Sequence, residues 1–293
     1  MKTSQITSRG RILSELLLKD DMKEFNPELL KQLYIPASDS HKSQNGKVML
    51  IAGSKLFHAA SIWPLSVMSR ICDMVFYAST TENNEIVAKM KEQFLNGIVI
   101  PRDKIDDYIE ESDVILIGPG MPRESGQQEG DDDTKVLTES LLTKYKDKKW
   151  VVDGGSLQTI NPDILPPTAI VTPHKGEFLK LFGMEPTEQS VPEMANKYNI
   201  VILSKGEIDI VSSPNETVTV RGGNAGMTKG GTGDVLAGLT TALYSKNDAY
   251  LSACAASYIN KKAGESLEQS MGLYYNSSDL ADEVPKVMKN LLL

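Results

Sequence analysis

The chain has 293 residues, of which 40% are hydrophobic and 24% charged, as in ordinary globular proteins. Its 31 basic and 39 acidic residues give a net charge of −8, which argues against a general nucleic-acid or anionic-membrane surface. No apolar run approaches the ~18 residues of a membrane span, and residues 1–5 lack the apolar segment of a signal peptide. We therefore expect a cytoplasmic protein that binds neither nucleic acid nor membrane. Cys72 and Cys254 lie in apolar helical contexts, which favours buried, reduced thiols.

Two short apolar runs at helical spacing precede the first strand pattern, one over residues 12–18 and one over residues 29–33. This part of the chain is too short, and too poor in glycine-rich motifs, for a separate catalytic domain. We interpret residues 1–40 as an N-terminal helical extension and residues 41–293 as one α/β domain.

Strand patterns and helix patterns then alternate from residue 47 to about residue 240. This alternation predicts a mostly parallel sheet with helices on both faces. The predicted strands are 47–52, 74–79, 97–100 (short and buried), 113–117, 150–153, 170–172 and 200–203, followed by a hairpin of 208–213 and 217–221. The predicted helices include 82–94, one from Thr134, one from about Val235, 248–268 and 277–292.

Glycine-rich or polar turns follow several of these strands. In chain order they are Gly53-Ser54, Gly118-Pro119-Gly120, Asp153, Thr172-Pro173-His174 and Ser204-Lys205-Gly206. Because the carboxyl ends of parallel strands share one edge of a sheet, these turns predict a single ligand cleft. For Gly-Pro-Gly alone, a purely structural turn remains open as an alternative. The acidic loop 123–133 is interpreted as a solvated loop that caps the next helix, in preference to a metal site.

A glycine-rich stretch opens the last third of the domain. Gly230, Gly231 and Gly233 surround Thr232 and end at Asp234, after which an apolar helical pattern begins. Glycines let the backbone approach a ligand, and the N–H groups at a helix start can cradle a phosphate. An ordinary aspartate is ionised at neutral pH, so Asp234 is suited to take a proton from a hydroxyl that attacks phosphorus. The alternative is that Asp234 only caps the helix.

The pattern Asn-x-x-Met-x-x-Gly-Gly-Thr-Gly-Asp-Val-Leu-Ala-Gly over residues 224–238 resembles the C-terminal signature of the NAD(P)H-hydrate dehydratases. These enzymes belong to the ribokinase-like superfamily. His41-Lys42, Gly118-Pro119-Gly120 and the Thr-Pro-His-x-Gly-Glu motif at 172–177 extend the resemblance over residues 41–290. It implies a ribokinase-like three-layer α/β/α fold with a mostly parallel central sheet, and a homo-oligomer, most simply a tetramer.

The resemblance also implies roles for individual residues, with Asp234 as the catalytic base. Substrate-binding roles fall on Ala60, Gly120, His174, Asn224 and Asp234. Nucleotide-binding roles fall on Lys205, Gly206, Glu207, Ile208, Asp209, Gly230, Gly231, Thr232 and Gly233. Mg²⁺ would be held through water by Asp153 and Glu177. The chain departs from the family pattern at Ala59, where relatives have glycine, and at Gly155, where they have a second aspartate.

The implied activity is the repair of hydrated NADH or NADPH. ADP or ATP would phosphorylate the ring hydroxyl, loss of phosphate would then re-form the cofactor, and ADP is the expected donor. Two alternatives remain open. One is a ribokinase-like kinase of a vitamin precursor, which the His-Lys, Gly-Pro-Gly and Thr-Pro-His-x-Gly-Glu set fits less well. The other is a non-catalytic nucleotide-binding sensor, whose mark would be the loss of Asp234.

Overall fold

The structure is a computed structural model and describes residues 22–94 and 96–293. Its strands form one nine-stranded sheet within these residues, in the order β3-β2-β1-β4-β5-β6-β7-β8-β9. Neighbouring strands run parallel from β3 through β7, whereas β8 and β9 pair antiparallel. The strands are β1 (Lys47–Ile51), β2 (Met74–Ala78), β3 (Ile98–Val99), β4 (Val114–Ile117), β5 (Lys149–Val152), β6 (Ala169–Val171), β7 (Val201–Ser204), β8 (Asp209–Ser212) and β9 (Thr217–Val220).

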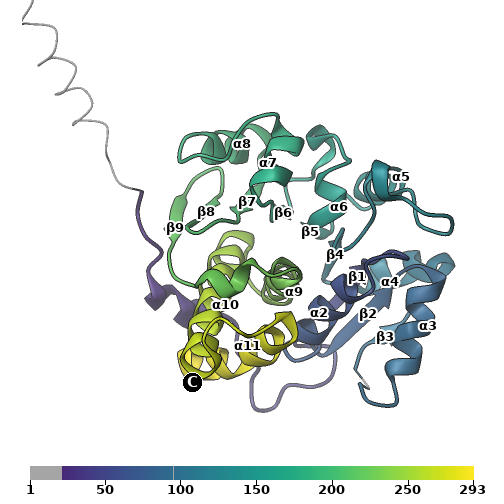
Figure 1. Cartoon of the computed structure of the whole chain (residues 1–293), viewed down its shortest axis with the longest axis horizontal. Helices are drawn as coiled ribbons and strands as arrows, with labels where there is room; N and C mark the ends of the chain where they lie inside the picture. Colours follow the sequence, from purple (N-terminus) through teal and green to yellow (C-terminus); the bar gives the residue numbers. More distant parts are fainter. Residues whose placement is uncertain (1–21, 95) are drawn as a thin grey trace, which may run out of the picture.

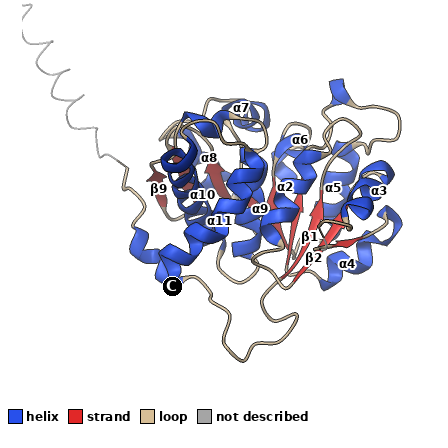
Figure 2. Cartoon of the chain, turned by 60° about the horizontal axis from the view of Figure 1, so that its bottom comes forward, coloured by secondary structure: helices blue, strands red, loops and turns tan. Residues whose placement is uncertain are grey.

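Helices cover both faces of this sheet (Figure 1, Figure 2). One face is covered by α2 (Ala59–Met68), α9 (Thr232–Tyr244), α10 (Ala249–Met271) and α11 (Ser277–Leu292). The other face is covered by α4 (Ile105–Glu111), α5 (Thr134–Lys144), α6 (Gly154–Leu157), α7 (Lys175–Phe182) and α8 (Ser190–Tyr198), and α3 (Thr81–Met90) flanks the edge near β3. Short 3-10 helices are η1 (Pro27–Gln32), η2 (Arg102–Lys104), η3 (Glu124–Gly126), η4 (Pro162–Ile164) and η5 (Ala225–Thr228).

Strand β1 shows how the three layers form. Val48 and Leu50 pack into the core under α2 and α9–α11, while Met49 and Ile51 pack into the core on the opposite face. Successive side chains of a strand point to opposite faces, so a sheet covered on both sides requires apolar residues at every position. The predicted three-layer fold with a mostly parallel sheet is confirmed.

Most predicted elements are present with shifted ends. The helix predicted at 82–94 ends at Met90, and the helix predicted from about Val235 begins at Thr232. The prediction that the strand at 97–100 is buried is wrong. β3 is an edge strand of two residues, and Ile98 is 43% exposed. An edge strand has a neighbour on one side only, which an apolar run in the sequence does not reveal.

The acidic loop 123–133 caps a helix, as predicted. Asp133 is the N-cap of α5, and its Oδ1 accepts a hydrogen bond of 3.0 Å from the amide of Val136. Asp132 pairs with Arg102, and Asp131 accepts a hydrogen bond from the amide of Lys55. Each of these aspartates therefore has a partner within the chain. Cys72 and Cys254 are buried thiols, and burial raises the pKa of each to about 12.

The helical pattern predicted at residues 12–18 lies outside the described residues. The run at 29–33 lies in and just after η1, where Leu30 and Leu33 join the core with Phe25. The amide of Phe25 donates to the carbonyl of Thr219 in β9 at 2.9 Å. This part of the predicted extension therefore packs onto the domain, and the boundary at residue 40 stays a prediction.

The order of strands places a crevice next to β1. The chain moves from β1 to β2 and β3 on one side and then returns to β4 on the other. The loops after β1 and β4 therefore diverge at the carboxyl edge of the sheet, which is where doubly wound folds bind ligands. Within residues 22–94 and 96–293, no helix has both the length and the hydrophobicity to cross a bilayer.

Candidate active site

A cavity of about 1750 Å³ opens at this edge, and every residue predicted for the site lines it. Its lining comes from the loops after β1, β4, β5, β6 and β7 and from the start of α9. Pockets for a single drug-sized ligand measure about 300–1,000 Å³, so this cavity has room for two ligands side by side. The roles assigned to the individual lining residues remain predictions.

The glycine-rich turn starts α9 in a backbone conformation that favours glycine. Gly231 is the N-cap residue, with φ +98°, and no side chain caps this helix. The amide of Thr232 donates to the carbonyl of Lys229 at 3.4 Å, and the next N–H groups, of Gly233 and Asp234, have no intrahelical acceptor at this helix start beside the cavity. Asp234 lies in the first turn and is not the cap, so the capping alternative for Asp234 is not realised.

Side chains from α9 itself, α11 and α2 hold this turn in place. Thr232 donates its hydroxyl to the carbonyl of Met227 at 2.7 Å, and Ser277 of α11 donates to the carbonyl of Gly230 at 2.7 Å. Trp63 of α2 packs against Gly231. The Thr232 side chain is thus used within the protein, which leaves backbone N–H groups as the groups offered to a phosphate.

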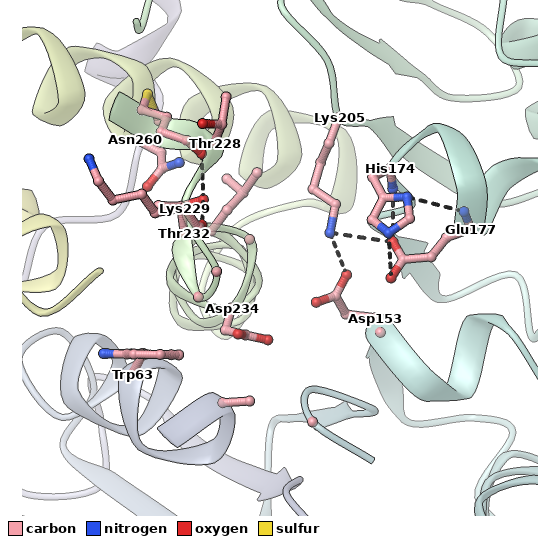
Figure 3. Close-up of a pocket in the computed structure, with 18 of the residues that line it drawn as sticks. Trp63, Asp153, His174, Glu177, Lys205, Thr228, Lys229, Thr232, Asp234 and Asn260 are labelled. Atoms are coloured by element: carbon pink, nitrogen blue, oxygen red, sulfur yellow. Dashed lines mark hydrogen bonds and ion pairs between the residues drawn. The ribbon is translucent and has the colours of Figure 1, made fainter. Parts of the chain in front are cut away.

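A compact group of charges lies in the cavity beside this turn (Figure 3). The ammonium of Lys205 is 2.8 Å from Asp153 Oδ1 and 3.6 Å from Glu177 Oε2. The hydroxyl of Thr172 donates to the same oxygen of Asp153 at 2.7 Å. The side chain of Lys205 thus contacts two carboxylates, and its expected place at an adenosine site stays a prediction.

The charge group shifts the pKa of Asp234. Burial, and then the negative charge of Asp153, raise this pKa to about 8, although the ammonium of Lys205 acts in the opposite direction. The expectation of an ordinary ionised aspartate is therefore wrong for the ligand-free protein. Burial also raises the pKa of Glu177, against the effect of Lys205. For Lys205, burial works toward a lower pKa, but Asp153 and Glu177 outweigh it and hold the pKa above its usual value.

His174 caps a helix as well as lining the cavity. Its Nδ1 accepts hydrogen bonds from the amides of Gly176 (3.0 Å) and Glu177 (3.2 Å) at the start of α7. Glu177 completes the capping box by accepting from the amide of His174 at 2.9 Å. Nε2 of this half-exposed ring lies 3.5 Å from Glu177 Oε1. Because Nδ1 accepts from the two amides, the predicted substrate contact would have to use Nε2.

The predicted nucleotide segment after β7 is held from behind. Asp209 is buried, and its carboxylate accepts from the amide of Gly206 at 2.9 Å and from the hydroxyl of Ser257 at 2.7 Å. Lys261 of α10 donates to the carbonyls of Gly206 and Glu207 at 3.2 and 3.0 Å. All residues of the segment line the cavity, and Asp209 and Lys261 hold it in place through these bonds. Lys261 was missed because Lys261-Lys262 reads as an ordinary solvated pair on a helix.

Two of the predicted substrate residues, Ala60 and Gly120, lie together at α2. A Cβ placed on Gly120 would lie 2.6 Å from that of Ala60, so this glycine lets the loop after β4 approach α2. Asn224 accepts from the amide of Gly226 (2.9 Å) and the hydroxyl of Tyr275 (2.6 Å), and donates to the carbonyl of Gly264 (2.7 Å). These bonds make Asn224 a brace for the glycine-rich stretch as well as a lining residue.

The predicted metal role of Asp153 and Glu177 stays a prediction, and the geometry does not favour it. Both carboxylates contact the Lys205 ammonium. Among residues 22–94 and 96–293, no group of three or more His, Cys, Asp or Glu side chains could hold a metal ion. A second carboxylate has no room at Gly155, where a Cβ would lie 2.1 Å from the carbonyl oxygen of Met121.

The comparisons of this chain with known proteins agree on one family. The family model for NAD(P)H-hydrate dehydratase matches residues 48–286. An ADP-dependent (S)-NAD(P)H-hydrate dehydratase of Nitrosopumilus maritimus is 34% identical over 91% of this chain and 97% of its own length. A bifunctional NAD(P)H-hydrate repair enzyme of Methanocaldococcus jannaschii is 35% identical over 89% of this chain, which spans about half (51%) of that longer protein.

Solved structures confirm the fold. A ribokinase-like protein of Enterococcus faecalis superposes with a TM-score of 0.80 over 92% of this chain and 96% of its own, at 22% identity. The ADP/ATP-dependent NAD(P)H-hydrate dehydratase of Bacillus subtilis, co-crystallised with ATP and Mg²⁺, superposes with a TM-score of 0.76, at 22% identity over 93% of this chain and 99% of its own. The match of residues 48–286 to the family model and the near full-length relative agree with the geometry of the cavity. The chain therefore belongs to the NAD(P)H-hydrate dehydratase family.

Proposed function

We propose that the chain catalyses the ADP-dependent dehydration of (S)-NAD(P)H-hydrate back to NADH or NADPH. The observation that carries this proposal is the position of Asp234 in the first turn of α9, beside the glycine amides and within a cavity large enough for a nucleotide and a dinucleotide. The curated relative from Nitrosopumilus maritimus bears the name of this activity.

In the proposed reaction, Asp234 takes the proton from the hydroxyl on the hydrated nicotinamide ring. The hydroxyl oxygen forms a bond to the terminal phosphorus of ADP, and the bond from that phosphorus to AMP breaks. Amides of the turn at Gly231–Gly233 stabilise the charge on the transferred group. Phosphate then leaves from the ring carbon, assisted by the ring nitrogen's lone pair, and the neighbouring carbon loses a proton to restore the double bond.

Asp234 must lose its own proton before it can act as the base. With a pKa of about 8 in the ligand-free protein, only part of the population is ready at neutral pH. Magnesium ions, where bound with the nucleotide, offset the charge of its phosphates. In the proposed reaction no step uses an ion held by Asp153 and Glu177, because both carboxylates contact Lys205.

Recovery of the dihydronicotinamide absorbance from hydrated NADH tests the proposal directly. ADP and ATP are supplied in separate reactions, and ADP is expected to support turnover. Turnover with ATP and none with ADP would reverse the choice of donor and leave the reaction intact. No recovery of absorbance with either nucleotide would overturn the proposed function and favour a vitamin-precursor kinase or a nucleotide sensor.

The proposal also includes a cytoplasmic location, which rests on the sequence composition, and assembly as a homotetramer, which rests on the family resemblance. Light scattering at micromolar concentration tests the assembly. A mass near the 32.1 kDa of one chain would contradict it.

A further inference from the structure

The cation that lies among the buried carboxylates of the cavity is a side chain. The Lys205 side chain is 15% exposed, and those of Asp153 and Glu177 are 3% and 5% exposed. Two carboxylates buried this deeply need a positive charge nearby, because removing an ion from water without a partner is costly. Lys205 supplies that charge at 2.8 Å from Asp153 and 3.6 Å from Glu177.

We propose that the ammonium of Lys205 is the resident cation of this active site, in the place where a protein-bound divalent ion would otherwise lie on Asp153 and Glu177. A divalent ion enters, on this proposal, only with the phosphates of the nucleotide. This role of Lys205 goes beyond the proposed function. It rests on that function in one respect only: the group that the ammonium faces is the transferred phosphoryl group.

The position of Lys205 relative to α9 supports this role. A Cβ placed on Gly233 would lie 3.3 Å from the ammonium nitrogen of Lys205. The ammonium therefore lies beside the helix start whose N–H groups are proposed to bind the transferred phosphoryl group. A lysine in that position can contact a phosphate oxygen as a point charge, as lysines of other phosphate sites do.

The backbone explains why Lys205 reaches the carboxylates. Its amide donates to the carbonyl of Pro173 at 2.8 Å, and residue 205 pairs with residue 174 in a parallel bridge. This short continuation of the β6–β7 pairing carries Lys205 past the end of β7, next to the start of α7, which holds Glu177. Gly155 leaves the loop after β5 without a second carboxylate, so the two negative charges of Asp153 and Glu177 share one ammonium.

Binding of Mn²⁺ in the absence of nucleotide tests the proposal, with electron paramagnetic resonance reporting the ion that stays in solution. Wild type should leave Mn²⁺ in solution. Lys205→Ala should expose the two carboxylates and bind one ion per chain at least about tenfold more tightly than wild type. Asp153→Asn in the Lys205→Ala background should abolish that gain.

Two variants serve as controls, and a third is a substitute for Lys205→Ala. Lys149→Ala removes another partly buried lysine, whose ammonium donates to the carbonyl of Tyr244 at 2.9 Å outside the cavity, and should bind no ion. Lys205→Arg keeps a cation and should also show no gain. Lys205→Gln, which is closer to lysine in length, replaces Lys205→Ala if the alanine variant does not fold by circular dichroism.

Two results would overturn the proposal. One is a wild-type protein that binds one Mn²⁺ and loses it in Asp153→Asn, because the ion would then share the site with Lys205. The other is a folded Lys205→Ala or Lys205→Gln variant with no gain in Mn²⁺ affinity. Neither measurement uses hydrated NADH, so a failure of the dehydratase proposal would be seen separately, in the absorbance assay.

Discussion

Trp63 of α2 packs directly against Gly231 at the start of α9. A Cβ placed on Gly231 would lie 2.3 Å from the indole carbon Cζ3, and the indole nitrogen donates to the hydroxyl of Ser278 at 3.0 Å. The indole thus fills the space that a side chain at residue 231 would need. The contact joins α2, α9 and α11 at the turn proposed to bind the phosphoryl group.

Gly231→Ala should destabilise the protein by about 1–3 kcal/mol, because φ +98° disfavours alanine and the new Cβ meets the indole. Gly230→Ala is the matched control, since a Cβ there meets nothing within 4 Å and its stability should change little. Urea denaturation of both variants measures the difference. Equal unfolding free energies for the two variants would show that the turn relaxes around Trp63 at no cost.

Asp234→Asn should slow turnover by about 10²–10⁴-fold, because asparagine cannot accept the hydroxyl proton. Steady-state rates with ADP and hydrated NADH measure the loss. Turnover within about threefold of wild type would show that another group is the base.

The same substitution should stabilise the ligand-free protein. The pKa of Asp234 rises from 3.8 to about 8 on folding, so the folded state binds the extra proton between these values and stability falls as pH rises through that range. Asparagine removes this loss. We expect the free energy of unfolding to rise by roughly 1–3 kcal/mol at neutral pH, because solvent in the cavity screens part of the electrostatic effect. A gain at neutral pH that disappears near pH 4 is the diagnostic pattern in urea denaturation.

The arrangement of the sheet followed from the sequence because the central parallel strands are mostly apolar and several of them end in a glycine or polar turn. The parallel topology then brings Gly120, His174 and Asp234 to one cavity, although they lie far apart in the chain. The spacing of the motifs along the chain is enough to predict that these residues share one cavity, without knowing where their side chains point.

The direction of long or charged side chains could not be read in this way. Lys205 has several rotatable bonds, and only the folded positions of Asp153 and Glu177 decide where its ammonium lies. The raised pKa of Asp234 likewise comes from burial and from a carboxylate 81 positions earlier in the chain. Sequence patterns record residue types and spacing, and these effects depend on three-dimensional neighbours.

Lys261→Met should destabilise the protein by about 3–5 kcal/mol, because it leaves the carboxylate of Asp209, 3.3 Å from the ammonium, buried without its cation. ADP affinity should fall as well, since the carbonyls of Gly206 and Glu207 lose their donor and the predicted nucleotide segment loosens. Urea denaturation and calorimetric titration with ADP measure the two effects.

The neighbouring lysine provides the control for that experiment. Lys262 pairs with Glu265 at 2.7 Å on the helix surface, and Lys262→Met should change stability by less than about 1 kcal/mol. Similar losses for the two variants would contradict a specific role for Lys261 behind the nucleotide segment.

Asp153→Asn should move the acid limb of the pH–rate profile to lower pH. In wild type, kcat/KM is expected to rise with pH around a midpoint of about 8, because only ionised Asp234 can act as the base. After burial, the charge of Asp153 is the largest contribution that raises this pKa, and Lys205 and Glu177 are the other charged groups that act on it. Loss of the Asp153 charge therefore favours ionised Asp234, and the Lys205 ammonium acts in the same direction.

Asp106→Asn is the control. It removes a carboxylate paired with Lys144 on the surface and should leave the acid limb in place. If Asp153→Asn leaves it in place too, the limb reports a group other than Asp234, and the electrostatic link between the two carboxylates is wrong.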